Sequence, residues 1–103
     1  MSSHQIGRCI DEDALQILRE IISSGGNFTF TPRADSEQRC CDIDWLDINY
    51  VLRHCKELRP DTGDYQGCYL ARGLTGDGNS VTLLVSLNKK QNRIKIVSVW
   101  RNN

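Results

Sequence analysis

The stretch "SVTLLVSLNKKQNRIKIVSVW", residues 80–100, decides the fold class of this 103-residue chain. Apolar side chains recur at alternate positions in 80–87 and again in 93–100, which is the period of a β-strand. The polar run between them, NKKQN, has the composition of a turn. The stretch therefore predicts two antiparallel strands joined by a short connection.

The second of these strands is apolar on both faces. Ile94 and Ile96 share one face, whereas Val97 and Val99 fall on the other. We expect a strand of this kind to be covered on both sides or to lie near the centre of the sheet.

A third strand is predicted upstream, over residues 65–74, where YQGCYLARGL is followed by the turn-forming run TGDGN. Strands joined this closely form an antiparallel meander of three. The preceding run KELRPDTGD, residues 56–64, is predicted to be a loop because Pro60 and Gly63 break regular structure.

Helical periodicity dominates the first half of the chain. Residues 10–24 place apolar side chains on one face of a helix, with Asp11 as its N-cap and Gly25-Gly26 at its end. The apolar face consists of Ile10, Ala14, Ile17, Leu18, Ile21 and Ile22. The following NFTFT, from residue 27, indicates a short strand or an extended linker.

Two further helices are predicted from their start signals. Thr31 before Pro32 has the pattern of an N-cap followed by proline at the first helical position, for a helix over 32–41. Asp44 caps the next helix, and Asp47 completes an approximate capping box. Periodicity predicts that Cys41 and Cys55 face the core and that Cys40 lies at its edge.

These elements together predict one α+β domain over residues 1–103: a helix, a short strand, two helices and a three-stranded antiparallel meander, with the helices packed on the sheet. The core is expected to contain the large aliphatic side chains of the helices and strands. They are Ile17, Ile21, Ile48, Val51, Leu52, Leu83, Val85 and Ile96.

Composition narrows the classes of function. Thirteen basic residues balance thirteen acidic ones, so the strong basic excess of a dedicated nucleic-acid binder is missing. There is no signal-peptide pattern and no apolar run of membrane-spanning length, so a cytoplasmic protein without membrane contact is expected. The five cysteines are odd in number and lack zinc-ligand spacing, so we expect reduced thiols, no metal and no cofactor.

The amino-acid sequence also resembles a family of small bacterial proteins of unknown function. Its template begins F-[ST]-x-H-A-x-x-R-M-x-x-R-x-I, continues with an acid-capped helix, and ends in strands that close on V-[ST]-V-[WY]. The likeness covers about residues 11–101, with ARGLTGDGNSVTLLVSL and IKIVSVWRN in the strand half. Matching positions in the helical half are Phe30, Thr31, Ala34, Ile43, Asp47, Val51 and Leu52.

That family is similar to the BrnT, MqsR and RelE toxins, which are small α+β ribonucleases of toxin–antitoxin systems. The resemblance implies a RelE/BrnT-like fold in a protein of a bacterium or a mobile element. At the polar positions of the template this chain departs, with Arg33 in place of His and Glu37 and Cys41 in place of the two arginines. Since histidine is the side chain suited to proton transfer near neutrality, these departures predict a protein that binds rather than cleaves.

Candidate site residues follow from the basic and aromatic side chains. RelE-like toxins cut RNA with basic and aromatic groups on the sheet, so Arg72, Trp100 and Arg101 are candidates to stack a base and hold a phosphate. The proposed binding set adds Arg33 and Arg39 from the helix, and Arg53 is a further arginine of the same surface. The alternative is that these arginines are only solvated surface residues.

Catalytic candidates are fewer. They are His54, Arg72 and Arg101, although a cation at the end of its helix also suits His54 as a partner of the helix dipole. An acidic face formed by Asp35, Glu37, Asp42, Asp44 and Asp47 is a separate possible partner surface.

The predicted function is that of a catalytically degenerate, toxin-like binding protein acting on a protein or RNA partner. The protein partner would be antitoxin-like or a target protein. Two alternatives stay open: a metal-independent endoribonuclease toxin, and a phage-type or immunity-type inhibitor. The oligomeric state is left undetermined.

Overall fold

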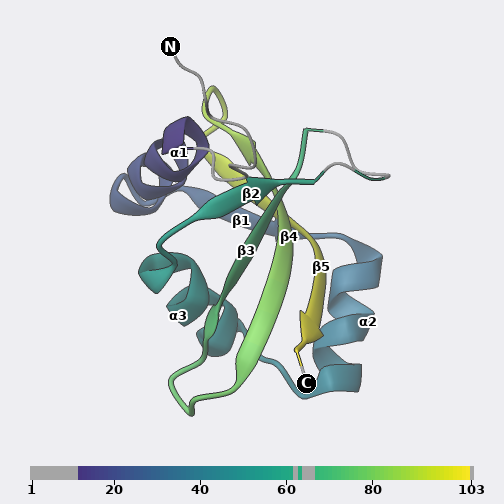
Figure 1. Cartoon of the computed structure of the whole chain (residues 1–103). Helices are drawn as coiled ribbons and strands as arrows, with labels where there is room; N and C mark the ends of the chain where they lie inside the picture. Colours follow the sequence, from purple (N-terminus) through teal and green to yellow (C-terminus); the bar gives the residue numbers. More distant parts are fainter. Residues whose placement is uncertain (1–11, 62, 64–66, 103) are drawn as a thin grey trace.

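The computed structural model describes residues 12–61, 63 and 67–102, and it has the mixed α+β class expected from the sequence (Figure 1). Its elements in chain order are α1 (Glu12–Ser23), β1 (Asn27–Phe30), α2 (Pro32–Cys41), α3 (Trp45–His54), β2 (Leu58–Pro60), β3 (Tyr69–Leu74), β4 (Ser80–Asn88) and β5 (Arg93–Arg101). The expected starts of two segments, Ile10 with Asp11 and residues 65–66, lie outside the described residues.

The sheet has five strands in the order β1-β5-β4-β3-β2, so the expected sheet of three strands was too small. The three expected strands are its inner part, with β3 antiparallel to β4 and β4 antiparallel to β5. The four-residue β1 adds a parallel strand beside β5, and β2 adds an antiparallel strand beside β3. The sequence predicts a loop at β2 because it contains Pro60. An edge strand tolerates a proline there, because no neighbouring strand needs an N–H group at that position.

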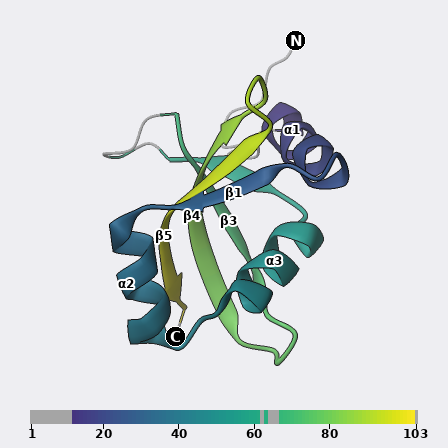
Figure 2. The same ribbon diagram turned by 180° about the vertical axis from the view of Figure 1, so that it is seen from behind.

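Helices α1 and α3 lie on one side of the sheet, and α2 lies beside β5 at the edge of the sheet (Figures 1 and 2). The helix starts follow the sequence signals. The Thr31 side chain accepts a hydrogen bond from the Ala34 N–H, and Asp44 and Asp47 form the reciprocal capping box. Helix α1 ends as expected at Gly25, whose φ of 74° suits glycine.

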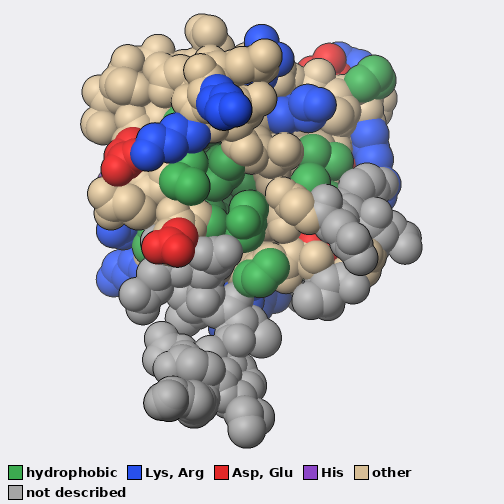
Figure 3. Space-filling model, turned by 90° about the horizontal axis from the view of Figure 1, so that it is seen from above, with side chains coloured by type: hydrophobic (Ala, Val, Ile, Leu, Met, Phe, Trp, Pro, Cys, Tyr) green, Lys and Arg blue, Asp and Glu red, His purple; other side chains and the backbone are tan. Residues whose placement is uncertain are grey.

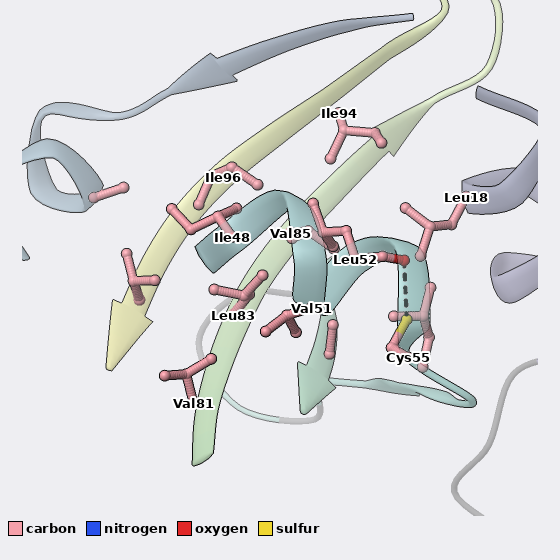
Figure 4. Packing of buried hydrophobic residues seen from close by; sticks show 14 of the residues in the cluster. Leu18, Ile48, Val51, Leu52, Cys55, Val81, Leu83, Val85, Ile94 and Ile96 are labelled. Carbon is pink, nitrogen blue, oxygen red and sulfur yellow. Dashed lines mark hydrogen bonds between the residues drawn. The ribbon is translucent and has the colours of Figure 1, made fainter. Parts of the chain in front are cut away.

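The core lies between the sheet and the pair α1 and α3 (Figure 4). Leu18 of α1 and Ile48, Val51 and Leu52 of α3 face side chains of β4 and β5 in this view. Of the eight expected core residues, seven are buried, and Ile17 is only partly buried. The buried strand residues of this core include Leu58, Ala71, Val81, Leu83, Val85, Ile94, Ile96 and Val99.

A β-bulge explains why β5 is apolar on both faces. Val85 pairs with Ile96 and Leu84 pairs with Ser98, so Val97 is an extra residue in β5. The extra residue reverses the alternation, and both Ile96 and Val99 therefore point into the same core. The apolar pattern marks a bulge rather than a strand covered on both sides.

Helix α2 closes the edge of β5 beyond the end of β1. The Thr31 N–H donates to the Ile96 carbonyl at 3.0 Å, and the Thr31 hydroxyl donates to the Val97 carbonyl at 2.8 Å. The Val99 N–H donates to Oε1 of Glu37 at 3.0 Å. Groups of α2 and of its N-cap residue thus form hydrogen bonds with backbone groups of β5 that would otherwise need a neighbouring strand.

The end of the molecule that carries α1 and the β4–β5 turn shows apolar side chains gathered at its centre, with Lys and Arg side chains around them (Figure 3). Partly buried apolar residues that pack on the core include Ile17, Ile22, Tyr69 and Leu87. No helix in the described part of the chain is both long and apolar enough to cross a membrane.

Candidate functional site

The sheet face opposite α1 and α3, which we call the open face, carries the expected aromatic and basic groups. Strand pairing aligns Arg72 of β3 with Thr82 of β4, and Thr82 with Trp100 of β5. Leu70 lies two residues before Arg72 and therefore shares its face. These side chains form a row across three strands on the side away from the core.

A hollow of about 290 Å³, which we call the sheet hollow, lies on the open face. It is lined by Glu57, Arg59, Leu70, Arg72, Thr82, Trp100 and Asn102. A second hollow of about 310 Å³ shares Leu70 and Trp100 with it and reaches Arg33 of α2 on one side and Asp61 on the other. The two hollows are therefore neighbours on the open face, with Leu70 and Trp100 between them.

Trp100 and Arg72 are the two side chains of the sheet hollow that are best placed to contact a ligand. Trp100 is 37% exposed, and Arg72 is exposed. Arg72 forms no ion pair or hydrogen bond within the described part of the chain. An indole face and an unpaired guanidinium at one hollow can stack on an aromatic ring and bind an anion.

The polar floor of the sheet hollow is already ordered. The Thr82 hydroxyl donates to Oδ1 of Asn102 at 2.9 Å, and Nδ2 of Asn102 donates to the Ser80 hydroxyl at 3.0 Å. Because an amide nitrogen carries two N–H groups, Asn102 retains a second donor for a ligand.

The rim of the open face pairs arginines with carboxylates. Arg59 contacts Glu57 at 3.1 Å, and Nε of Arg33 contacts Oε2 of Glu37 at 3.3 Å. Burial raises the pKa of the Glu37 carboxyl, but hydrogen bonds from Ser98, Val99 and Arg33 together outweigh burial and hold its pKa below the ordinary value of 4.5. Glu37 is therefore a carboxylate at neutral pH and a structural partner of β5.

Three of the expected site residues are brought together and three are not. Arg33, Arg72 and Trp100 border the open face. Arg101 is on the opposite face of β5 from Trp100, where its Nε donates to the Cys41 carbonyl at 2.6 Å and its Nη2 to the Asp42 carbonyl. Arg101 therefore caps the C-terminal end of α2 and faces away from the sheet hollow.

Arg39 and His54 lie away from the sheet hollow. Arg39 borders a shallow depression between α2 and α3 together with Asp35, Asp42 and Asp44. His54 is at the end of α3, where its Nδ1 is 2.8 Å from the Tyr50 carbonyl oxygen. It is on the core side of the sheet, so it cannot act on a ligand in the hollow.

Sequence reasoning missed Glu57, Arg59 and Asn102. The first two lie at β2, whose three residues carry too little alternation to be recognised. Asn102 follows the last predicted strand directly, and the alternation that places Trp100 on the open face also places Asn102 there.

The cysteines form no metal site in the described ranges. No group of three or more His, Cys, Asp or Glu side chains there could hold an ion. Cys55 is buried as expected, Cys41 is intermediate and Cys40 is exposed. Burial raises the pKa of the Cys55 thiol. Burial also raises the pKa of the Cys68 thiol, and the negative charge of Asp61 adds a smaller effect in the same direction.

Comparison of the chain with family models, with curated proteins and with solved structures gave no match. The most distinctive feature of the described residues is the sheet hollow, with its exposed indole and exposed arginine.

Proposed function

We propose that this protein binds single-stranded RNA on the open face of its sheet and does not cleave it. The observation that carries the proposal is the exposed ring of Trp100 beside the exposed Arg72, which has no partner among the described residues, at the sheet hollow. Sheet-borne aromatic rings stack on unpaired bases, and arginines bind the phosphates that connect them.

Several details favour a single strand over a duplex. A ring that lines a hollow can stack on a base only when that base is not already stacked within a helix. The polar floor around Asn102 and Thr82 offers hydrogen-bonding groups to a base edge or a ribose hydroxyl. Arg72 borders the same hollow and supplies positive charge at its rim, whereas the charge of Arg59 is offset by Glu57.

The lack of a suitable acid–base pair favours binding over cleavage. Cleavage of RNA through the 2′-hydroxyl needs one group to accept its proton and another to protonate the leaving oxygen. Arginine does neither, because it stays protonated at any working pH. The sheet hollow holds one carboxylate, Glu57, and no histidine among the described residues that line it.

Fluorescence anisotropy with a labelled single-stranded oligoribonucleotide tests the proposal. Since base stacking contributes about 1–3 kcal/mol, Trp100→Ala is expected to weaken binding by about 5- to 150-fold. Arg72→Ala should reduce the slope of log K against log salt by about 0.7, the value for one phosphate contact. Arg53→Ala, which removes an exposed arginine of α3, is the matched control and should leave both quantities unchanged.

Two results would contradict this function. One is the absence of RNA binding at low salt by the folded wild-type protein. The other is binding that Trp100→Ala and Arg72→Ala leave intact while circular dichroism shows a native fold. A DNA oligonucleotide of the same sequence shows whether the ribose hydroxyl contributes.

A second candidate, a metal-independent endoribonuclease, is favoured by one observation. Glu57 lines the sheet hollow, and its contact with Arg59 at 3.1 Å fixes a carboxylate beside the proposed RNA path. A carboxylate in that position can accept a proton from a 2′-hydroxyl. RNA cuts by the wild type that disappear in Glu57→Gln would establish this candidate in place of the first.

A further inference from the structure

Helix α3 presents a stripe of side chains that the core does not use. Leu46, Tyr50 and His54 are spaced by four residues and therefore share one side of the helix, opposite the buried Ile48 and Leu52. Leu46 is 72% exposed and Tyr50 is 42% exposed. The rings of Tyr50 and His54 stack with their centroids 4.1 Å apart, so the stripe has a flat aromatic surface.

Charge runs along the same helix in one direction. Asp44 and Asp47 lie at its N-terminal end, whereas Arg53 and Lys56 lie at and just beyond its C-terminal end. Asp47 and Arg53 are placed symmetrically about Tyr50, each three residues from it, and therefore flank the stripe on its two sides.

Such a pattern complements itself under a two-fold rotation. A second α3 that lies antiparallel, with the axis at Tyr50, brings the acidic end of one helix to the basic end of the other. An isologous interface requires this self-complementarity, because the same patch contacts itself. The exposed Leu46 of each copy then lies at the level of His54 of the other copy and loses its contact with water.

We propose that the α3 stripe, consisting of Leu46, Tyr50 and His54, is the contact surface for a second copy of this chain. The two α3 helices pack antiparallel about an axis at Tyr50, with opposite charges at both ends. Helix α3 is on the side of the sheet away from the sheet hollow, so the hollow of each copy stays open in the dimer (Figure 1).

The size of the contact predicts a weak dimer. Ten residues of helix extend only about 15 Å. A contact of this length falls below the area of about 800 Å² per partner that stable complexes bury. The dimer should therefore exchange with monomer, with a dissociation constant in the micromolar range or above.

Sedimentation equilibrium of the wild type over about 5 to 500 µM protein tests the association. A monomer–dimer equilibrium is expected, and Leu46→Asp should shift it to monomer. The double variant Arg53→Glu with Lys56→Glu should weaken association by about 10-fold or more, because it brings acids against acids. Lys90→Glu with Lys95→Glu makes the same change in charge on the β4–β5 turn and β5, away from α3, and should dimerise like the wild type.

Disulfide trapping tests the register. A residue on a two-fold axis faces its own copy, so Tyr50→Cys should give a 50–50 cross-link on mild oxidation, whereas Ser36→Cys on α2 should not. Peptide mass spectrometry identifies the bond. A wild type that remains monomeric at every concentration overturns the proposal, as does a dimer that Leu46→Asp and the double variant leave intact. Cross-linking at position 36 rather than 50 overturns it as well.

Discussion

Removal of the Glu37 carboxylate should destabilise the fold through the edge of β5, because one carboxylate oxygen accepts two hydrogen bonds there. Oε1 is 3.0 Å from the Val99 nitrogen and 2.7 Å from the Ser98 hydroxyl, and Ser98 is only 2% exposed. A buried N–H left without a partner costs about 1–3 kcal/mol, so we expect about 2 kcal/mol for Glu37→Ala. In a domain of this size that corresponds to a fall in Tm of about 10 °C.

The effect should depend on pH in a defined direction. The pKa of Glu37 is lower in the folded state than its ordinary value of 4.5. The ionised carboxylate therefore contributes its full stabilisation above pH 4.5, and this is lost as the pH falls through the folded-state pKa. The difference in stability between wild type and Glu37→Gln should accordingly be largest near neutrality and vanish in acid.

Urea unfolding at several pH values measures both quantities. Glu57→Gln is the matched control, since it removes a half-buried carboxylate whose ion-pair partner among the described residues is Arg59, at the surface, and it should cost less than about 1 kcal/mol. A double-mutant cycle with Ser98→Ala should give a coupling of about 1 kcal/mol. A Glu37→Ala protein as stable as the wild type, or a difference that grows in acid, would refute the reasoning.

Two further predictions concern the core and the thiols. Leu52 and Leu83 are 2% and 0% exposed, so replacing either by Ala should lower the free energy of unfolding in urea by about 2–5 kcal/mol. Leu46→Ala, at an exposed site, should lower it by less than about 0.5 kcal/mol. Equal losses at all three sites would contradict the packing of the helices on the sheet. In the native state the exposed Cys40 should react with a thiol reagent well before the buried Cys55, because burial raises the pKa of the Cys55 thiol. Peptide mapping measures the order of modification, and a Cys55 that is modified first would show that this part of the core is open to solvent.

The helix starts could be predicted from the sequence because their signals are local. Thr31 with Pro32, and Asp44 with Asp47, each satisfy backbone groups within one turn, and both appear in the structure as expected. The short strand from residue 27 was also predicted, but its place in the sheet could not be, and the segment of β2 was not recognised as a strand. Strand β1 joins the sheet by pairing with β5, far away in the sequence, and nothing within its four residues specifies that partner.

The candidate site was predicted in part. The period of a strand places Trp100 and Arg72 on positions that can share a face, once the strand register is known. The same period excludes Arg101 from the site, since neighbours on a strand point to opposite faces, and the expectation that paired it with Trp100 overlooked this. The contribution of Arg59 needed the fold, because β2 becomes a strand only through its pairing with β3.

The most direct test of the RNA-binding claim is the fluorescence of Trp100 itself. The chain has two tryptophans, and Trp45 packs against Phe28 and Phe30, with ring centroids 4.6 Å and 5.9 Å away. In Trp45→Phe, Trp100 is therefore the sole tryptophan, and its emission reports on the sheet hollow. Titration with single-stranded RNA should quench this emission saturably, with the same midpoint as anisotropy. Binding that leaves the Trp100 emission unchanged would contradict the account.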